Sequence, residues 1–353
     1  MSRKARTKSR SWAGSIGKIA LVFLLAGALT VVLMVPVVLL AVYNVANEGL
    51  VDSAGRTFAD WDAETVISVV WNHRVFYYGS TVAQAIGFVA AVWLVHARSD
   101  RRDGWRLSGG EGRESRSGRL HRAKPPGAAA TLAAGLMSGT VLVAALAAAM
   151  WLLPGAMTMA TDVDGEIPSR PFGNAAAWTT AAAQLALFVL VSLNEVVFVQ
   201  GYAQGLLRHR HGRTAGLAGA VLLFTLLHGL NPGLLAHAAL PLANTALLAL
   251  LLAAAREASG GIWQPVGLHL AWSYVQGCVL GVPVAGFTAP SLLRLELPAA
   301  PGLELWTGGA FGPQGSLPAT AVLLAACWWQ LRRLRRKRAA AVYPNPYQEH
   351  ATR

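Results

Sequence analysis

The residues best suited to chemistry are one carboxylate and two imidazoles that lie inside apolar segments: Glu195, His228 and His269. A charged side chain near the centre of a membrane span costs about 2.5–3.5 kcal/mol even on the scale that gives the smallest penalties. Ionisable residues at such positions are rare and usually serve a function. These three residues are therefore the first candidates for an active site.

Four polar residues lie at a similar distance from the basic residue that ends their own predicted helix. The separation is 12–15 residues in each case, which corresponds to about 18–22 Å of helix at 1.5 Å per residue. We therefore expect four helices to bring polar groups to one depth in the bilayer. The four residues are Glu195, His228, Asn244 and His269.

This set has two chemical uses. One glutamate and two histidines are the ligands of a hydrolytic Zn²⁺ site that leaves a fourth position for water. Alternatively, Glu195 acts as a general base on water while a histidine stabilises the developing oxyanion, without a metal. The sequence leaves both mechanisms open.

The composition indicates which elements must position these residues. The chain of 353 residues is 54% hydrophobic and only 13% charged, with a mean hydropathy of +0.43. These values are typical of a polytopic membrane protein. The net charge of +13 comes from basic groups at the ends of apolar runs, a pattern of membrane orientation and anionic-lipid contact that argues against a nucleic-acid partner. Cys278 and Cys327 lie in apolar runs and imply no disulfide framework.

The apolar runs predict an all-α integral membrane bundle of about eight transmembrane helices. The first run is too long for the core of a signal peptide, which is about 7–15 residues, so we expect it to be retained as a helix. The eight predicted spans are approximately residues 19–43, 76–95, 127–153, 175–207, 215–230, 235–254, 262–284 and 316–331.

The loops between the predicted spans alternate in charge. Segments assigned to the inside are rich in Lys and Arg, and those outside are neutral or acidic, which predicts a plasma-membrane protein with both termini cytoplasmic. The predicted organisation is a basic cytoplasmic N-terminus (1–18), two helices with an external loop (19–97), a basic disordered cytoplasmic loop (98–126), a transmembrane core (127–331) and a basic cytoplasmic tail (332–353).

Three motifs occur in order within residues 175–331. A Glu-Glu-x-x-x-Arg-Gly motif is represented by Glu195-Val-Val-Phe-Val-Gln-Gly201, and a Phe-x-x-x-His motif is intact as Phe224–His228. A His-x-x-x-Asn motif is represented by His269–Ser273, and Asn244 matches an asparagine often found between them. In these motifs the chain resembles the CPBP family of intramembrane proteases, which includes the CAAX prenyl endopeptidases and bacterial self-immunity proteins.

The chain departs from the family pattern at three positions. Val196 replaces the second Glu, Gln200 replaces the Arg, and Ser273 replaces the Asn. Losing the Glu and the Arg together is chemically coherent, because losing only one would leave a buried charge unpaired. The resemblance implies Glu195, His228 and His269 as catalytic residues. It implies a supporting role for Asn244, Gln200, Ser273 and Phe224.

The expected function is that of an intramembrane endopeptidase, with Zn²⁺ as one option for its cofactor. By resemblance, its partners are membrane lipids and a substrate that is a lipidated protein tail or a membrane-associated peptide. The alternative is a catalytically inactive relative that acts as a peptide-binding, immunity or scaffold protein. A secondary transporter is a weaker third class, since the sequence shows no paired halves with interrupted helices.

Overall fold

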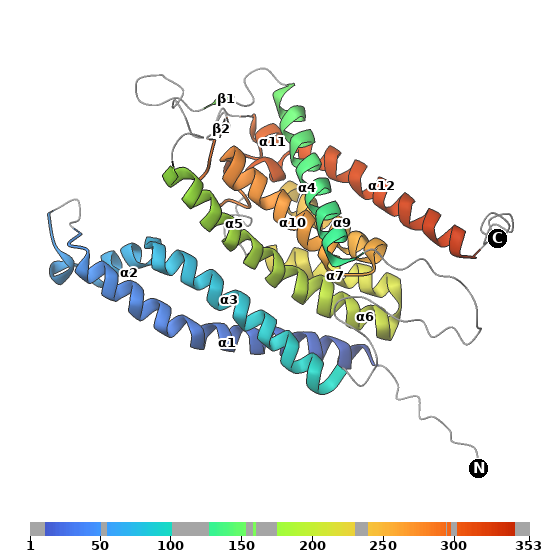
Figure 1. Ribbon diagram of the computed structural model, residues 1–353, viewed down its shortest axis with the longest axis horizontal. Helices are drawn as coiled ribbons and strands as arrows, with labels where there is room; N and C mark the ends of the chain where they lie inside the picture. The colour runs from blue at the N-terminus through green and yellow to red at the C-terminus, as the bar shows by residue number, and fades with distance from the viewer. Residues whose placement is uncertain are drawn as a thin grey trace, which may run out of the picture. The chain divides into compact units, whose positions relative to one another are not determined.

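The computed structural model shows a helical protein that divides into two compact units. The first unit comprises Met1–Gly104 and Ala186–Phe198, and the second comprises Trp105–Leu185 and Val199–Arg353. Each unit is described by itself below (Figure 1). The structure describes residues 11–50, 55–100, 127–152, 158–159, 175–229, 239–293, 295–297 and 302–342.

The first unit is built on two long helices that lie side by side, α1 (Trp12–Asn47) and α3 (Arg74–Val95). A 3₁₀ turn, η1 (Phe58–Asp60), and a short helix, α2 (Ala63–Asn72), connect them. A π-helical turn, η2 (His96–Asp100), follows α3. The predicted polar loop between the first two spans therefore contains a helix that the sequence analysis did not anticipate.

The start of α2 and its apolar face explain why this connection is helical. The side chain of Asp62 accepts a hydrogen bond from the backbone N–H of Thr65 at 2.8 Å, which caps the helix. Val70 is buried against Val45 and Phe76, so α2 closes the end of the α1–α3 pair. The polar residues that suggested an open loop lie on the solvent side of this small core.

The second unit contains most of the helices. A long helical run belongs partly to both units and consists of α5 (Ala175–Val196), π-helical η5 (Val197–Ala203) and α6 (Gln204–His211). The remaining elements are α4 (Ala128–Trp151), β1 (Thr158–Met159), α7 (Arg213–Gly229), α9 (Ala239–Ser259), α10 (Trp263–Tyr274), π-helical η6 (Val275–Leu280), β2 (Leu295–Glu296), α11 (Glu304–Thr307), η7 (Gly309–Phe311), η8 (Pro313–Gly315) and α12 (Leu317–Val342).

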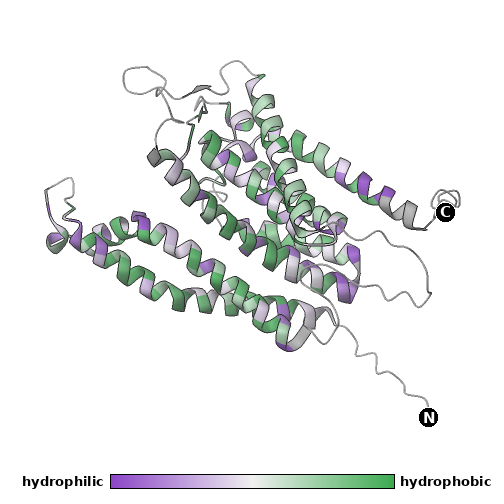
Figure 2. Cartoon of the chain, in the orientation of Figure 1, coloured by the Kyte–Doolittle hydropathy of each residue, from purple (hydrophilic) through white to green (hydrophobic). Residues whose placement is uncertain are grey.

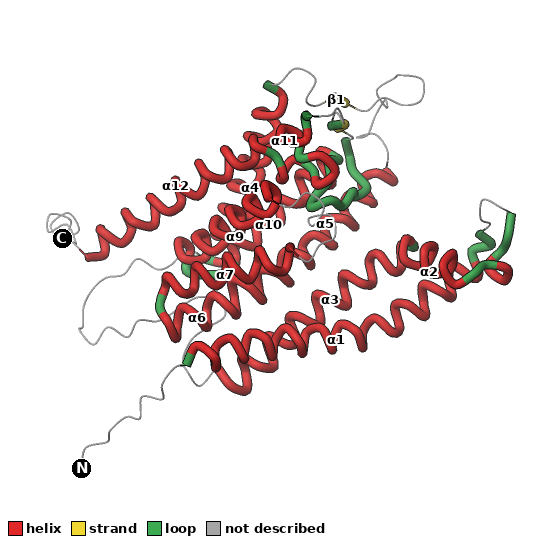
Figure 3. The backbone as a smooth tube through the Cα atoms, turned by 180° about the vertical axis from the view of Figure 1, so that it is seen from behind, coloured by secondary structure: helices red, strands yellow, loops and turns green. Residues whose placement is uncertain are grey.

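The connection between α10 and α12 carries most of the described irregular backbone of this unit. Figure 3 shows these loop segments gathered beside α11 and β1. The two short strands pair antiparallel, with Thr158 opposite Glu296. The strands do not change the fold class, which is all-α as predicted.

Small residues bring α4 and α10 into close contact. A Cβ added at Gly135 would overlap the carbonyl oxygen of Gln264, and one added at Gly267 would overlap that of Leu132. Gly139 packs in the same way against Leu268. Small residues at this spacing allow helix backbones in membranes to approach closely. This contact fixes the position of α10.

Five described helices are long and apolar enough to cross a membrane: Trp12–Asn47, Arg74–Arg98, Ala128–Trp151, Ala177–His211 and Ala239–Ser259. They correspond to five of the eight predicted spans. The predicted fifth span corresponds to the shorter apolar helix α7, and the seventh and eighth correspond to α10–η6 and α12. Figure 2 shows the hydrophobic surface along α1 and the hydrophilic residues toward the end of α12.

Two predicted boundaries differ from the structure. Helix α12 continues to Val342, so the predicted tail from residue 332 begins as helix. Helix α1 begins at Trp12, within the predicted basic N-terminus. The predicted disordered loop at 98–126 lies almost entirely outside the described residues.

Candidate functional site

Both predicted catalytic histidines contact the same phenylalanine in the second unit. His228 lies in the last turn of α7, and its ring stacks on Phe224 with centroids 4.1 Å apart and an interplanar angle of 21°. His269 on α10 approaches the same ring edge-on, at 5.9 Å and 80°. Phe224 is fully buried. The fold therefore brings two motifs from separate helices to one point.

The tautomer of His228 follows from its backbone contact. Its Nδ1 lies 3.0 Å from the carbonyl oxygen of Phe224, one turn earlier. A carbonyl oxygen only accepts hydrogen bonds, so Nδ1 carries the proton and donates it. The neutral imidazole then has its lone pair on Nε2.

His269 lies in a segment that is buried on all sides. Every residue from Pro265 to Ser273 is buried, and His269 itself is 4% exposed. A helix that is buried around its whole circumference lies inside a bundle. In such surroundings charges interact more strongly than they do in water.

Glu195 belongs to the first unit and lies at the end of α5. Its side chain is half-buried, and its Oε2 is shielded from solvent. The helix changes to π geometry two residues later, at Val197. Short π-helical segments are rare and frequently occur at functional sites. Within the same unit, Phe198 packs against Phe23 and Phe88, with ring centroids 6.1 and 5.3 Å apart, which anchors this turn.

The residues at the substituted motif positions are all buried. Val196 and Gln200 are 0% exposed, and Ser273 is 5% exposed. Neither amide atom of Gln200 has a hydrogen-bond partner among the described residues. A buried amide without a partner is costly, so Gln200 is suited to receive a polar group that enters the protein.

Asn244 has a structural position that the motif did not reveal. Its Nδ2 donates to the carbonyl oxygens of Gln314 and Ser316, at 2.9 Å each, and its Oδ1 accepts from Thr320 at 2.7 Å. All the hydrogen bonds of this amide are thus used between α9, η8 and α12. Asn244 ties these elements together.

The fit of a metal can be judged from the available ligands. Within the part of the chain that the structure describes, no group of three or more His, Cys, Asp or Glu side chains is placed to hold a metal ion. The described residues therefore do not form the predicted Zn²⁺ site, and we derive no step through a metal.

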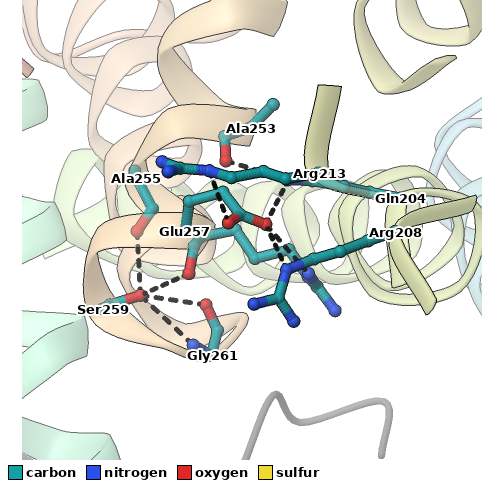
Figure 4. Close-up of polar contacts among 9 residues, drawn as sticks. Gln204, Arg208, Arg213, Ala253, Ala255, Glu257, Ser259 and Gly261 are labelled. Carbon is teal, nitrogen blue, oxygen red and sulfur yellow. Dashed lines mark hydrogen bonds and ion pairs between the residues drawn. The ribbon is translucent and has the colours of Figure 1, made fainter. Parts of the chain in front are cut away.

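A second polar cluster, which the sequence analysis missed, surrounds Glu257 at the end of α9. Figure 4 shows Arg208 and Arg213 converging on its carboxylate, with Nε–oxygen distances of 3.1 and 2.9 Å. Arg256 lies 3.8 Å from the same carboxylate, and Gln204 donates to the carbonyl oxygen of Ala253 at 3.0 Å. The side chain of Glu257 is only 5% exposed. The signal for this cluster was the Arg256-Glu257 pair, which was interpreted only as the end of a span.

The helices define the class of this chain as an all-α integral membrane protein. Residues 177–275 match the family model described as Type II CAAX prenyl endopeptidase Rce1-like. This match confirms, over that segment, the resemblance to the CPBP family that the motifs indicated. Neither curated proteins nor solved structures gave a significant match. The matched segment includes Glu195, Gln200, Phe224, His228, Asn244, His269 and Ser273.

Proposed function

We propose that the chain is an intramembrane endopeptidase of the CAAX-protease type. The observation that carries this proposal is the contact of His228 and His269 with one buried ring, Phe224, inside the segment that matches the prenyl endopeptidase family. Two imidazoles from separate helices meet there, and Glu195 is the carboxylate of the same matched segment.

The proposed reaction is hydrolysis of a peptide bond. Glu195 accepts a proton from water, and the water oxygen attacks the carbonyl carbon of the scissile bond. His228, with its proton held on Nδ1 by Phe224, offers Nε2 as an acceptor that orients this water. His269 donates a hydrogen bond to the oxyanion of the tetrahedral intermediate. Glu195 then returns the proton to the leaving amine as the carbon–nitrogen bond breaks.

The proposed substrate is a lipidated C-terminal tail or another membrane-associated peptide. The description of the matched family as a prenyl endopeptidase supports this class. The unpartnered amide of Gln200 supports it as well, because a peptide group offers both the donor and the acceptor that this side chain needs. We propose the plasma membrane as the location.

The first test compares the peptide termini of cells that express wild type with those of cells that express Glu195→Gln at matched levels. The substitution keeps the shape of the side chain and removes the base, so we expect new termini with wild type and at least about a hundredfold fewer with the variant. Glu64→Gln, at an exposed position on α2, is the matched control and should behave as wild type.

Identical termini from folded wild type and Glu195→Gln would contradict the proposal. That result would indicate an inactive relative with a peptide-binding, immunity or scaffold role. A second assay uses a lipidated fluorogenic peptide with protein in liposomes, which removes the dependence on cellular substrates. Loss of cleavage on chelation and its recovery with Zn²⁺ would select the metal mechanism over the glutamate mechanism that we propose.

A further inference from the structure

A cavity of about 120 Å³ lies between α7 and α12 in the second unit. Its walls combine two arginines with leucines, a composition that differs from that of the site described above. A cavity with cationic and apolar walls fits a ligand that has an anionic group and an apolar part. The lining residues are Arg213, Thr214, Leu217, Leu331, Leu334 and Arg335.

The cationic wall belongs to a cluster with surplus positive charge. Arg208, Arg213 and Arg256 all contact the single carboxylate of Glu257. One carboxylate balances only one of three guanidinium charges. The contact of Arg213 runs through Nε, at 2.9 Å (Figure 4). A guanidinium has further N–H donors on its two terminal nitrogens, and these suit a second anionic acceptor.

The residues that precede the cavity on α12 mark a membrane–water boundary. Trp328 and Trp329 are 60% and 55% exposed. The guanidinium groups of Arg332 and Arg333 lie over their rings, 4.9 and 5.3 Å from the centroids. Exposed tryptophans followed by arginines are typical of the headgroup level of a bilayer. The lining residues of α12 lie in this same stretch, where lipid phosphates occur.

We propose that this cavity binds the headgroup of an anionic phospholipid. Arg213 and Arg335 contact the lipid phosphate, and the leucines contact the glycerol and the first carbons of the acyl chains. The bound lipid adds the negative charge that Glu257 alone does not supply. The proposal does not depend on the proposed catalytic activity.

The test uses the purified full-length chain in detergent. Native mass spectrometry measures the binding of dioleoylphosphatidylglycerol, with dioleoylphosphatidylcholine as the comparison. We expect preferential binding of the anionic lipid, and about tenfold weaker binding of it by Arg335→Ala, the effect of one lost charge-assisted contact. Arg335→Lys should recover part of the affinity. Arg336→Ala removes the same charge from the next, exposed residue and should bind as wild type.

Two outcomes would overturn the proposal. Equal losses in Arg335→Ala and Arg336→Ala would show a general attraction of the basic tail and no defined site. Displacement of the lipid by inorganic phosphate at equal concentration would show that the cavity takes a free anion and that the leucine wall contributes nothing. The unfolding temperature of each variant is measured alongside, so that a misfolded protein is not counted as one that fails to bind lipid.

Discussion

Single residues explain how the chain tolerates the loss of a charged pair from its first motif. Val196 and Gln200 stand where the family has Glu and Arg, and both are completely buried. An ion pair at such positions depends on both partners, because removing one leaves an uncompensated buried charge. The two neutral residues are therefore best understood as one joint replacement.

We predict that Gln200→Arg alone destabilises the protein by about 3–5 kcal/mol, the typical cost of a buried charge without its partner. Adding Val196→Glu should restore a substantial part of this loss, because the guanidinium then regains a carboxylate. The measurement is the free energy of unfolding of both single variants and the double variant in the same detergent. Strictly additive effects would show that the two positions are independent.

The acidic residue that follows α1 provides a prediction about pH. His73 Nε2 lies 3.2 Å and Arg74 3.3 Å from Glu48. The Nδ1 of His73 accepts a hydrogen bond from the N–H of Val75, so Nε2 carries the proton that is donated to Glu48. This hydrogen bond, followed by the charges of His73 and Arg74, lowers the pKa of Glu48 below its usual value of 4.5, against a smaller opposing effect of burial.

A lowered pKa in the folded state means that the Glu48 contacts contribute fully above pH 4.5 and are lost as the pH falls through the lowered value. We predict faster hydrogen exchange at the start of α3 below this range, after correction for the intrinsic pH dependence of exchange. Glu48→Gln should exchange faster at neutral pH and show no further change of this kind on acidification. The same acid response in both proteins would assign it to another group.

At the scale of elements, the contact between α4 and α10 determines where His269 lies. Gly267 is two residues from this histidine and meets the backbone of α4 directly. We predict that Gly267→Ala destabilises the protein by about 1–3 kcal/mol, the usual cost of overpacking, and also lowers activity because α10 must shift. The measurement pairs the unfolding temperature with the peptide-cleavage assay.

The matched control is Gly27→Ala on α1, where an added Cβ would have no neighbour within 4 Å. This change should be neutral or slightly stabilising, because alanine favours helix more than glycine does. If both alanine variants had the same stability as wild type, the close approach of α4 and α10 would not be rigid.

The sequence predicted the helices well because each apolar run was long and ended at basic or turn-forming residues. It also predicted that His228 and His269 lie at a common level, since each could be counted from a basic anchor. It did not predict the π-helical segments, because no residue type specifies an extra residue in a turn. The bonds of Asn244 to residues 314–320 were equally inaccessible, since they join segments about 70 residues apart.

At the scale of the whole molecule, the distribution of Lys and Arg predicts both termini on the same side of the membrane. The two native cysteines are buried, so a single introduced cysteine can report its side with a membrane-impermeant maleimide. We predict that Ser2→Cys and Ala351→Cys are labelled only in inside-out vesicles. Ala59→Cys, in the exposed turn before α2, should be labelled only in right-side-out vesicles. Labelling of the two termini from opposite sides would require an odd number of spans.

The π-helical turn Val197–Ala203 constrains how the length of this chain can change during evolution. Each residue of an α-helix turns the chain by about 100°, so deleting one residue here would rotate everything that follows. Gln204 would then leave the carbonyl oxygen of Ala253, and Arg208 would leave Glu257. Relatives that keep this architecture should therefore vary here by substitution, whereas insertions and deletions should be confined to the connections between helices.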